Sequence, residues 1–295
     1  MSPAAVLVYL MIILIWGSSW FVIRFQTGEV EPLIGVVYRF ALGSLILMVW
    51  CSLSGARLRL RASEHRWLAL QGICLFGLNY WLMYESTRYL TSGVVATLFA
   101  NFVVFNLING RIFLKRPVSR DMALGAITGV AGVVALFWPE VSQLSLRDSA
   151  MTGLVLTLAA TWLASLGSIA ATRNLQYRLP ATSANAWGMF YGALMLTAIA
   201  LIRGETFSWP GTQAFTLSLL YLSVVASVLC FGALLWLIAE VGPERAGYTA
   251  TVIPVVALSI SSLLEGYQWT TQGMIGLLMI ISGNVMISRM RTSVT

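Results

Sequence analysis

The sequence predicts an all-α integral membrane protein with ten transmembrane helices, built as two inverted repeats of five helices. Three observations predict this fold class. The 295 residues are 58% apolar and only 10% charged. The apolar residues fall into blocks about as long as a membrane span, which takes about 20 residues. Short motifs also recur at a spacing close to half the chain.

The charged fraction excludes a soluble protein of this size, because ordinary globular chains are about 25% charged. The long apolar blocks exclude spanning β-strands, which alternate in polarity over about 10 residues. Cys51, Cys74 and Cys230 all lie in apolar blocks, so we expect no disulfide, no metal site and no cofactor. The basic residues form no single patch, so the net charge of +7 predicts no nucleic-acid partner.

Each apolar block is bounded by charged or turn residues and predicts one span. No Lys or Arg precedes the first block, and Trp16 and Trp20 replace the small residues of a cleavage site, so we expect a span there and no signal peptide. The predicted spans are 4–23, 33–53, 67–87, 92–112, 121–138, 150–171, 183–202, 214–238, 246–264 and 272–288.

Lys and Arg are distributed unequally across this topology. Twelve lie in connections on one side and four on the other, while Arg39 and Arg111 fall inside spans. Because the cytoplasmic side carries the excess of Lys and Arg, both termini are predicted to be cytoplasmic. The connections are at most about a dozen residues long, so no soluble catalytic domain is inserted.

The two halves of the chain share motifs in the same order, at offsets of 146 to 154 residues. Five spans per half is an odd number, so the second half must be inverted in the membrane. We predict repeats at 1–143 and 144–295, and inverted repeats are typical of alternating-access transporters. The matching features are Trp16 with Trp162, Pro32 with Pro180, Gly93 and Thr97 with Gly247 and Thr251, and Gly125 and Gly132 with Gly276 and Gly283.

With these motifs the chain resembles the EamA-type branch of the drug/metabolite transporter superfamily. The resemblance covers essentially the whole chain and depends on Trp-Gly-Ser-Ser at 16–19, Pro32 followed by Arg39-Phe40, and Gly276 and Gly283. Within the branch it is closest to aromatic amino-acid exporters. It implies a basket-shaped bundle in a bacterial inner membrane, with spans 1–4 and 6–9 around a central cavity, and export of amino acids from the cytoplasm. The pattern Pro254…Glu265 is typical of the family, but the first half has Ala100 or a nearby residue in place of the proline, and Lys115-Arg116 where an acidic residue is common.

Polar groups near the membrane midplane are costly unless they face protein or water, so they are candidates for a substrate site. Tyr80 and Tyr84 are four residues apart and share one helical face beside Asn79. This face suits a ligand with an aromatic or apolar side chain, and a packed core stripe is the alternative. Pro254 breaks a backbone hydrogen bond and is a candidate hinge. The full set of predicted substrate-binding residues is Trp16, Asn79, Tyr80, Tyr84, Asn101, Trp162 and Trp187.

Arg39 and Glu85 lie at similar predicted depth near the outer side and are expected to pair. The pair would serve as an outer gate or carboxylate site, or simply as a fixed structural ion pair, since a lone Arg at that depth is expensive. No Asp or Glu lies near the centre of any span, and the single histidine, His65, is in a predicted loop. A proton relay is therefore disfavoured, and uniport of a neutral or zwitterionic amino acid is favoured.

Two alternatives are left open by the sequence. The same fold would also export other small neutral hydrophobic metabolites or drugs. A membrane-embedded enzyme is the least favoured reading, because the chain shows no paired carboxylates, metal cluster or Ser–His pair. We therefore expect the lipid bilayer and a small molecule as the partners of this protein, and no catalysis.

Overall fold

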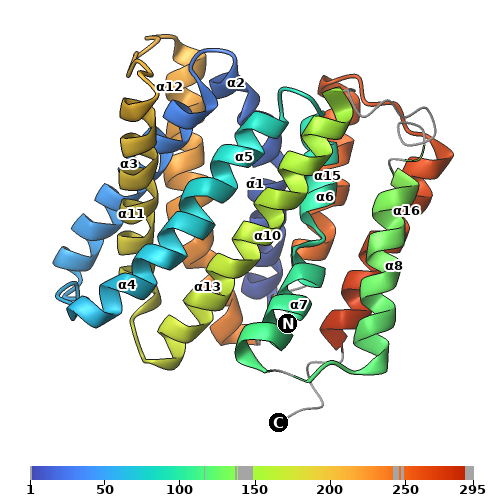
Figure 1. The fold of residues 1–295 in the computed structure, drawn as a ribbon, viewed down its shortest axis with the longest axis horizontal. Coiled ribbons are helices and arrows are strands. Elements are labelled where there is room, and N and C mark those ends of the chain that lie inside the picture. The colour runs from blue at the N-terminus through green and yellow to red at the C-terminus, as the bar shows by residue number, and fades with distance from the viewer. Residues whose placement is uncertain are drawn as a thin grey trace. The chain divides into compact units, whose positions relative to one another are not determined.

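The computed structural model describes residues 2–115, 117–136, 138, 149–241, 246 and 249–289, and its elements are helical (Figure 1). The predicted division at 143/144 lies outside these residues, as does Gly247. Six helical runs are long and apolar enough to cross a membrane. The elements of the first half are α1 Pro3–Val22, α2 Arg24–Thr27, α3 Pro32–Leu53, α4 Ala62–Gln71, η1 Gly72–Leu78, α5 Asn79–Ser86, α6 Ser92–Phe99, α7 Phe102–Leu114 and α8 Arg120–Leu136. Those of the second are α10 Ser149–Gln176, α11 Ala181–Ile202, α12 Gln213–Leu220, η2 Tyr221–Leu229, α13 Cys230–Val241, α15 Thr249–Leu264 and α16 Thr271–Arg289.

Every predicted span coincides with one helix or with consecutive helices, and two bounds need correction. The third span begins at Ala62, five residues before the expected start, because its first turn is polar and Glu64 accepts a hydrogen bond from the backbone N–H of Arg61. The sixth ends at Gln176 rather than 171, with Arg173 in its last turn. Charged side chains at helix ends reach the interface on their apolar stems, so apolar length alone underestimates such helices.

Two spans contain a π-helical segment, η1 in the third and η2 in the eighth. Their first residues, Gly72 and Tyr221, are 149 positions apart, which matches the repeat spacing. In η2 the hydroxyl of Ser227 donates to the carbonyl of Leu222, five residues earlier. Because π-helical turns are rare and concentrate at functional sites, their occurrence at equivalent places makes these two spans candidates for the functional site.

The fourth span is interrupted where α6 ends and α7 begins. The backbone N–H groups of Ala100 and Asn101 bond back to Thr97 and Leu98, the tighter three-residue pattern. No proline causes this interruption. In the second half the equivalent place holds Pro254, and α15 continues through it. The helix is therefore interrupted in the half that lacks the predicted hinge proline, and it continues in the half that carries it.

The chain forms two compact units, each with helices from both halves of the sequence. The first unit comprises residues 1–21, 86–158 and 230–295, and the second comprises 22–85 and 159–229. In the first unit α8 and α16 lie side by side (Figure 1). A Cβ on Gly125 would lie 2.8 Å from the carbonyl oxygen of Gly283, and one on Gly132 would lie 2.7 Å from that of Gly276. The glycines that revealed the repeat thus bring two helix backbones together.

The second unit is built around α3 and α11, which also lie side by side (Figure 1). The segment η1 packs on α11 through glycines, since a Cβ on Gly77 would lie 3.4 Å from the Cα of Gly192. Gly43 of α3 lies against η2, where a Cβ would be 3.8 Å from the carbonyl oxygen of Ser223. The two π-helical segments therefore pack against the paired helices α11 and α3.

Candidate functional site

Arg39 is the centre of a polar cluster in the second unit. It lies on α3 and is only 2% exposed. Its Nε donates to the hydroxyl of Ser227 at 3.1 Å, and its Nη1 donates to the hydroxyl of Tyr84 at 3.4 Å. The guanidinium also lies 4.6 Å from the ring centroid of Tyr80 and 5.2 Å from that of Phe40, within cation–π range. A buried cation is thus held by hydroxyls and aromatic faces.

Tyr84 extends this cluster toward the end of the first predicted span. Its side chain is fully buried, and its hydroxyl donates to Oε1 of Gln26 at 3.0 Å. Gln26 follows the first span in α2, and Ser227 belongs to the eighth. Side chains from four separate stretches of the sequence are therefore joined in one buried polar cluster. Tyr80 and Tyr84 both contact it, which confirms that they share a helical face.

The expected pair between Arg39 and Glu85 is not what the structure shows. Among the described residues, the groups that contact the guanidinium are the hydroxyls and rings named above, and the Glu85 carboxylate is not one of them. The reason is angular. Successive helical residues are about 100° apart, so turning Tyr84 toward Arg39 turns Glu85 away. Similar depth in the membrane is not sufficient for contact.

Some amide and hydroxyl groups of the second unit keep unused hydrogen-bonding capacity. Asn79 is buried and donates to the carbonyl of Leu75, but its Oδ1 has no partner among the described residues. The same holds for Nε2 of Gln26 and Oγ of Ser223. Buried polar atoms are normally satisfied, so each of these is a place where water or a polar ligand would bind.

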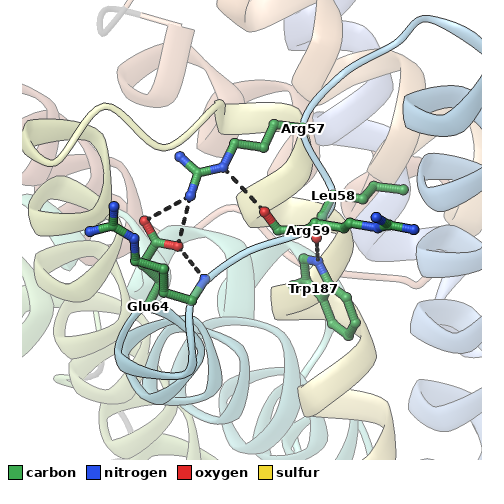
Figure 2. A network of polar contacts seen from close by, with 6 residues as sticks. Arg57, Leu58, Arg59, Glu64 and Trp187 are labelled. Carbon is green, nitrogen blue, oxygen red and sulfur yellow. Dashed lines mark hydrogen bonds and ion pairs between the residues drawn. The ribbon is translucent and has the colours of Figure 1, made fainter.

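Trp187 is the counterpart of Arg39 in the second repeat. Arg39 follows Pro32, at the start of α3, by seven positions, and Trp187 follows Pro180, at the start of α11, by the same number. Its indole N–H donates to the carbonyl of Leu58 at 3.1 Å, as Figure 2 shows. Its ring contacts those of His65 and Tyr191, with centroids 4.7 and 5.9 Å away. The structure therefore anchors Trp187 to the connection between α3 and α4.

That connection has its own polar network (Figure 2). Arg57 donates from Nη2 to both carboxylate oxygens of Glu64, at 3.4 and 3.2 Å, and from Nε to the carbonyl of Arg59 at 3.2 Å. This holds the connection against the start of α4, so that the Leu58 carbonyl is available to Trp187.

A network of neutral amides connects α4, α10 and α11. Asn174 donates to Oε1 of Gln71 at 2.9 Å, and Gln71 donates to Oδ1 of Asn185 at 3.3 Å. Asn174 stands 148 positions after Gln26, the same offset as the two prolines. Sequence reasoning missed Gln26, Gln71 and Asn174, and this shared offset is the signal that would have found the first and last.

The remaining predicted site residues each have surroundings of their own. Trp16, in the first unit, contacts the ring of Phe231 edge-on at 5.3 Å. Pro254 is buried within α15. Trp162 is 46% exposed. Within the second unit the structure thus brings together Arg39, Tyr80 and Tyr84.

Asn101, in the first unit, lies at the interruption between α6 and α7. It donates to the carbonyl of Leu98 at 3.2 Å, and Asn284 of α16 donates to the carbonyl of Ala100 at 2.9 Å. The Oδ1 atoms of both amides are buried without a partner among the described residues. The side-chain N–H of Asn101 therefore has an acceptor, whereas its side-chain oxygen has no donor among the described residues.

Ten predominantly apolar spans in two repeats, with enclosed polar side chains between helices, define a polytopic membrane protein with an architecture typical of transporters. The model of the EamA-like transporter family matches residues 3–138 and 151–289, and the chain belongs to this family. The family carries the two-repeat membrane fold within the drug/metabolite transporter superfamily.

Curated relatives match over most of their length. The chain is 27% identical to the uncharacterized inner membrane transporter YedA of Escherichia coli K12 over 89% of this chain and 85% of that protein. It is 23% identical to the uncharacterized transporter YoaV of Bacillus subtilis, over 92% and 91%. It is 25% identical to a probable amino-acid metabolite efflux pump of Salmonella typhimurium, over 93% and 91%. One solved crystal structure covers all of both chains with a TM-score of 0.69 at 16% identity, which shows the likeness of fold.

Proposed function

We propose that this protein exports neutral amino acids with aromatic or other apolar side chains from the cytoplasm across the inner membrane, by alternating access. Family membership supports transport. One relative is named a probable amino-acid metabolite efflux pump, and another an inner membrane transporter. Both termini are cytoplasmic in this proposal, in keeping with the distribution of Lys and Arg. No catalysis is involved.

The observation that carries the proposed substrate class is the environment of Arg39. Its positive charge is buried, yet the groups around it among the described residues are neutral. A charge held this way within a membrane is costly and gains most from an anion. A carboxylate is the anion that a guanidinium binds best, and the rings of Tyr80 and Phe40 beside it suit an apolar side chain.

The proposed mode of transport depends on where the acidic residues lie in the sequence. The span centres contain no Asp or Glu, so they offer no carboxylate to carry protons through the membrane. We propose facilitated export down the concentration gradient. The alternative cargo, a neutral hydrophobic metabolite or drug, has no carboxylate and would leave Arg39 without a role in transport.

Purified protein in liposomes tests the proposal directly. Uptake of labelled aromatic amino acids should exceed that of empty liposomes, and unlabelled aromatic amino acids should compete. Uptake should proceed without a pH gradient, and strict dependence on one would rule out uniport.

An aromatic amine that lacks the carboxylate separates the two kinds of cargo. It should compete poorly with the matching amino acid in the unaltered protein. Arg39→Gln should lower amino-acid uptake by about 10- to 100-fold, the loss expected for charge-assisted hydrogen bonds, and reduce the preference for the carboxylate. Arg203→Gln is the matched control, since Arg203 is half exposed and pairs with Glu205. Equal competition by amine and amino acid would favour the neutral metabolite.

A further inference from the structure

A second group of arginines lies in the second unit, around Trp67 of α4. The guanidinium carbon of Arg173 lies 4.1 Å from the Trp67 ring centroid and 4.3 Å from that of Tyr177. Arg66 lies 5.8 Å from the same Trp67 centroid. Two like charges from different helices, α4 and α10, therefore converge on one indole ring.

The group has hydrogen-bond donors in excess. Glu64 is the only acidic residue of α4, and its carboxylate is bound by Arg57 and by the backbone N–H of Arg61. The N–H of Trp67 is enclosed and has no acceptor among the described residues. Two guanidinium groups therefore lie at a ring whose N–H is unsatisfied, and neither pairs with a carboxylate in the described part of the chain.

The surroundings fit a lipid. Leu70 follows Arg66 by four residues, so it lies on the same face of α4 one turn nearer the middle of the span, and it is exposed. Tyr177, the first residue after α10, is exposed beside Arg173. Positive charge at the helix ends, with exposed apolar side chains next to it, matches a phosphate headgroup followed by acyl chains.

We propose that Arg66, Arg173 and Trp67 form a binding site for the phosphate of an anionic phospholipid, with Arg173 held in place between the rings of Trp67 and Tyr177. This site is separate from the Arg39 cluster and does not depend on the proposed substrate. Stacking on two rings fixes the orientation of the planar guanidinium of Arg173, which leaves its N–H edges to donate to the phosphate oxygens.

Lipid retention tests this site. The full-length protein is incorporated in bilayers of phosphatidylcholine with a minor share of phosphatidylglycerol, extracted in mild detergent, and its bound lipid counted by native mass spectrometry. The unaltered protein should retain phosphatidylglycerol preferentially. Arg66→Gln and Arg173→Gln should each lower this retention about 5-fold, the effect of one basic residue near a charged leaflet. Trp67→Phe should lower it less, since it removes the N–H and keeps the ring.

Arg57→Gln is the matched control, because it removes an equal charge from the neighbouring connection, where Arg57 is already paired with Glu64. An equal loss in this control would show a general surface charge and overturn the site. Displacement of the lipid by inorganic phosphate alone at millimolar concentration would overturn the lipid assignment. Should Arg173→Gln fold poorly, Arg66→Gln decides the matter alone, since Arg66 is exposed.

Discussion

The Nε atom of Arg39 lies 3.1 Å from the hydroxyl oxygen of Ser227, although the two residues are 188 positions apart. Ser227 in turn donates to the Leu222 carbonyl within the π-helical segment η2. One hydroxyl therefore connects a buried charge on α3 to an irregular part of the eighth span. This arrangement lets the serine both accept from the arginine and satisfy a backbone carbonyl in the wider helical turn.

Replacing Ser227 tests how much this contact contributes. Ser227→Ala leaves Nε of Arg39 buried without its acceptor, so the free energy of unfolding should fall by about 1–3 kcal/mol. Thermal unfolding in detergent measures it. Ser259→Ala is the control, because Ser259 is exposed and its hydroxyl donates to the Val255 carbonyl of its own helix. Identical melting temperatures for both variants would show that the contact contributes nothing.

Trp187→Phe separates an anchoring role from a substrate-binding one. The variant loses the hydrogen bond to the Leu58 carbonyl but keeps a ring against His65, so stability should fall by about 0.5–1.5 kcal/mol. Transport in liposomes should stay close to normal. Trp236→Phe, at an exposed position, controls for loss of an indole. A strong loss of transport at unchanged stability would instead place the substrate against Trp187.

Local patterns in the sequence predicted the spans and the shared face of Tyr80 and Tyr84, because both depend on helical periodicity and apolar length. Gly125 and Gly132 were recognisable by their repetition in the second half, and the structure shows what they do.

The partner of Arg39 could not be predicted from the sequence. Ser227 is one hydroxyl in a long apolar stretch, and nothing near it in the chain marks it. Charge complementarity instead pointed to Glu85, whose direction around the helix is set by tertiary packing. The π-helical segments were also beyond local reasoning, since their residues are as apolar as those of any span.

Glu265 offers a test within the first unit. Its Oε2 accepts from the backbone N–H of Ser92 at 3.0 Å, from the Ser92 hydroxyl at 2.7 Å, and from the Ser261 hydroxyl. It thereby holds the start of α6 to the end of α15. Glu265→Gln introduces an amide N–H among these donors and should lower the free energy of unfolding by about 1–3 kcal/mol.

The control for Glu265 is Glu205→Gln, which removes a carboxylate from a pair with the half-exposed Arg203. Surface pairs of this kind contribute about 0–1 kcal/mol. If both variants unfold at the same temperature, the hydrogen bonds of Glu265 do not stabilise the contact between α6 and α15.

The contact between α8 and α16 gives the sharpest prediction on stability. In Gly132→Ala the new methyl group would lie 2.7 Å from the Gly276 carbonyl oxygen and 2.8 Å from the Ile280 backbone nitrogen. Because both are backbone atoms, the helices must separate, and the free energy of unfolding should fall by about 1–3 kcal/mol.

Gly232→Ala is the control, since a Cβ there meets nothing within 4 Å and Gly232 lies inside α13. Alanine favours a helix over glycine by about 1 kcal/mol, so the control should be neutral or more stable. Thermal unfolding of the two variants should move in opposite directions, and a common shift would contradict close contact between α8 and α16.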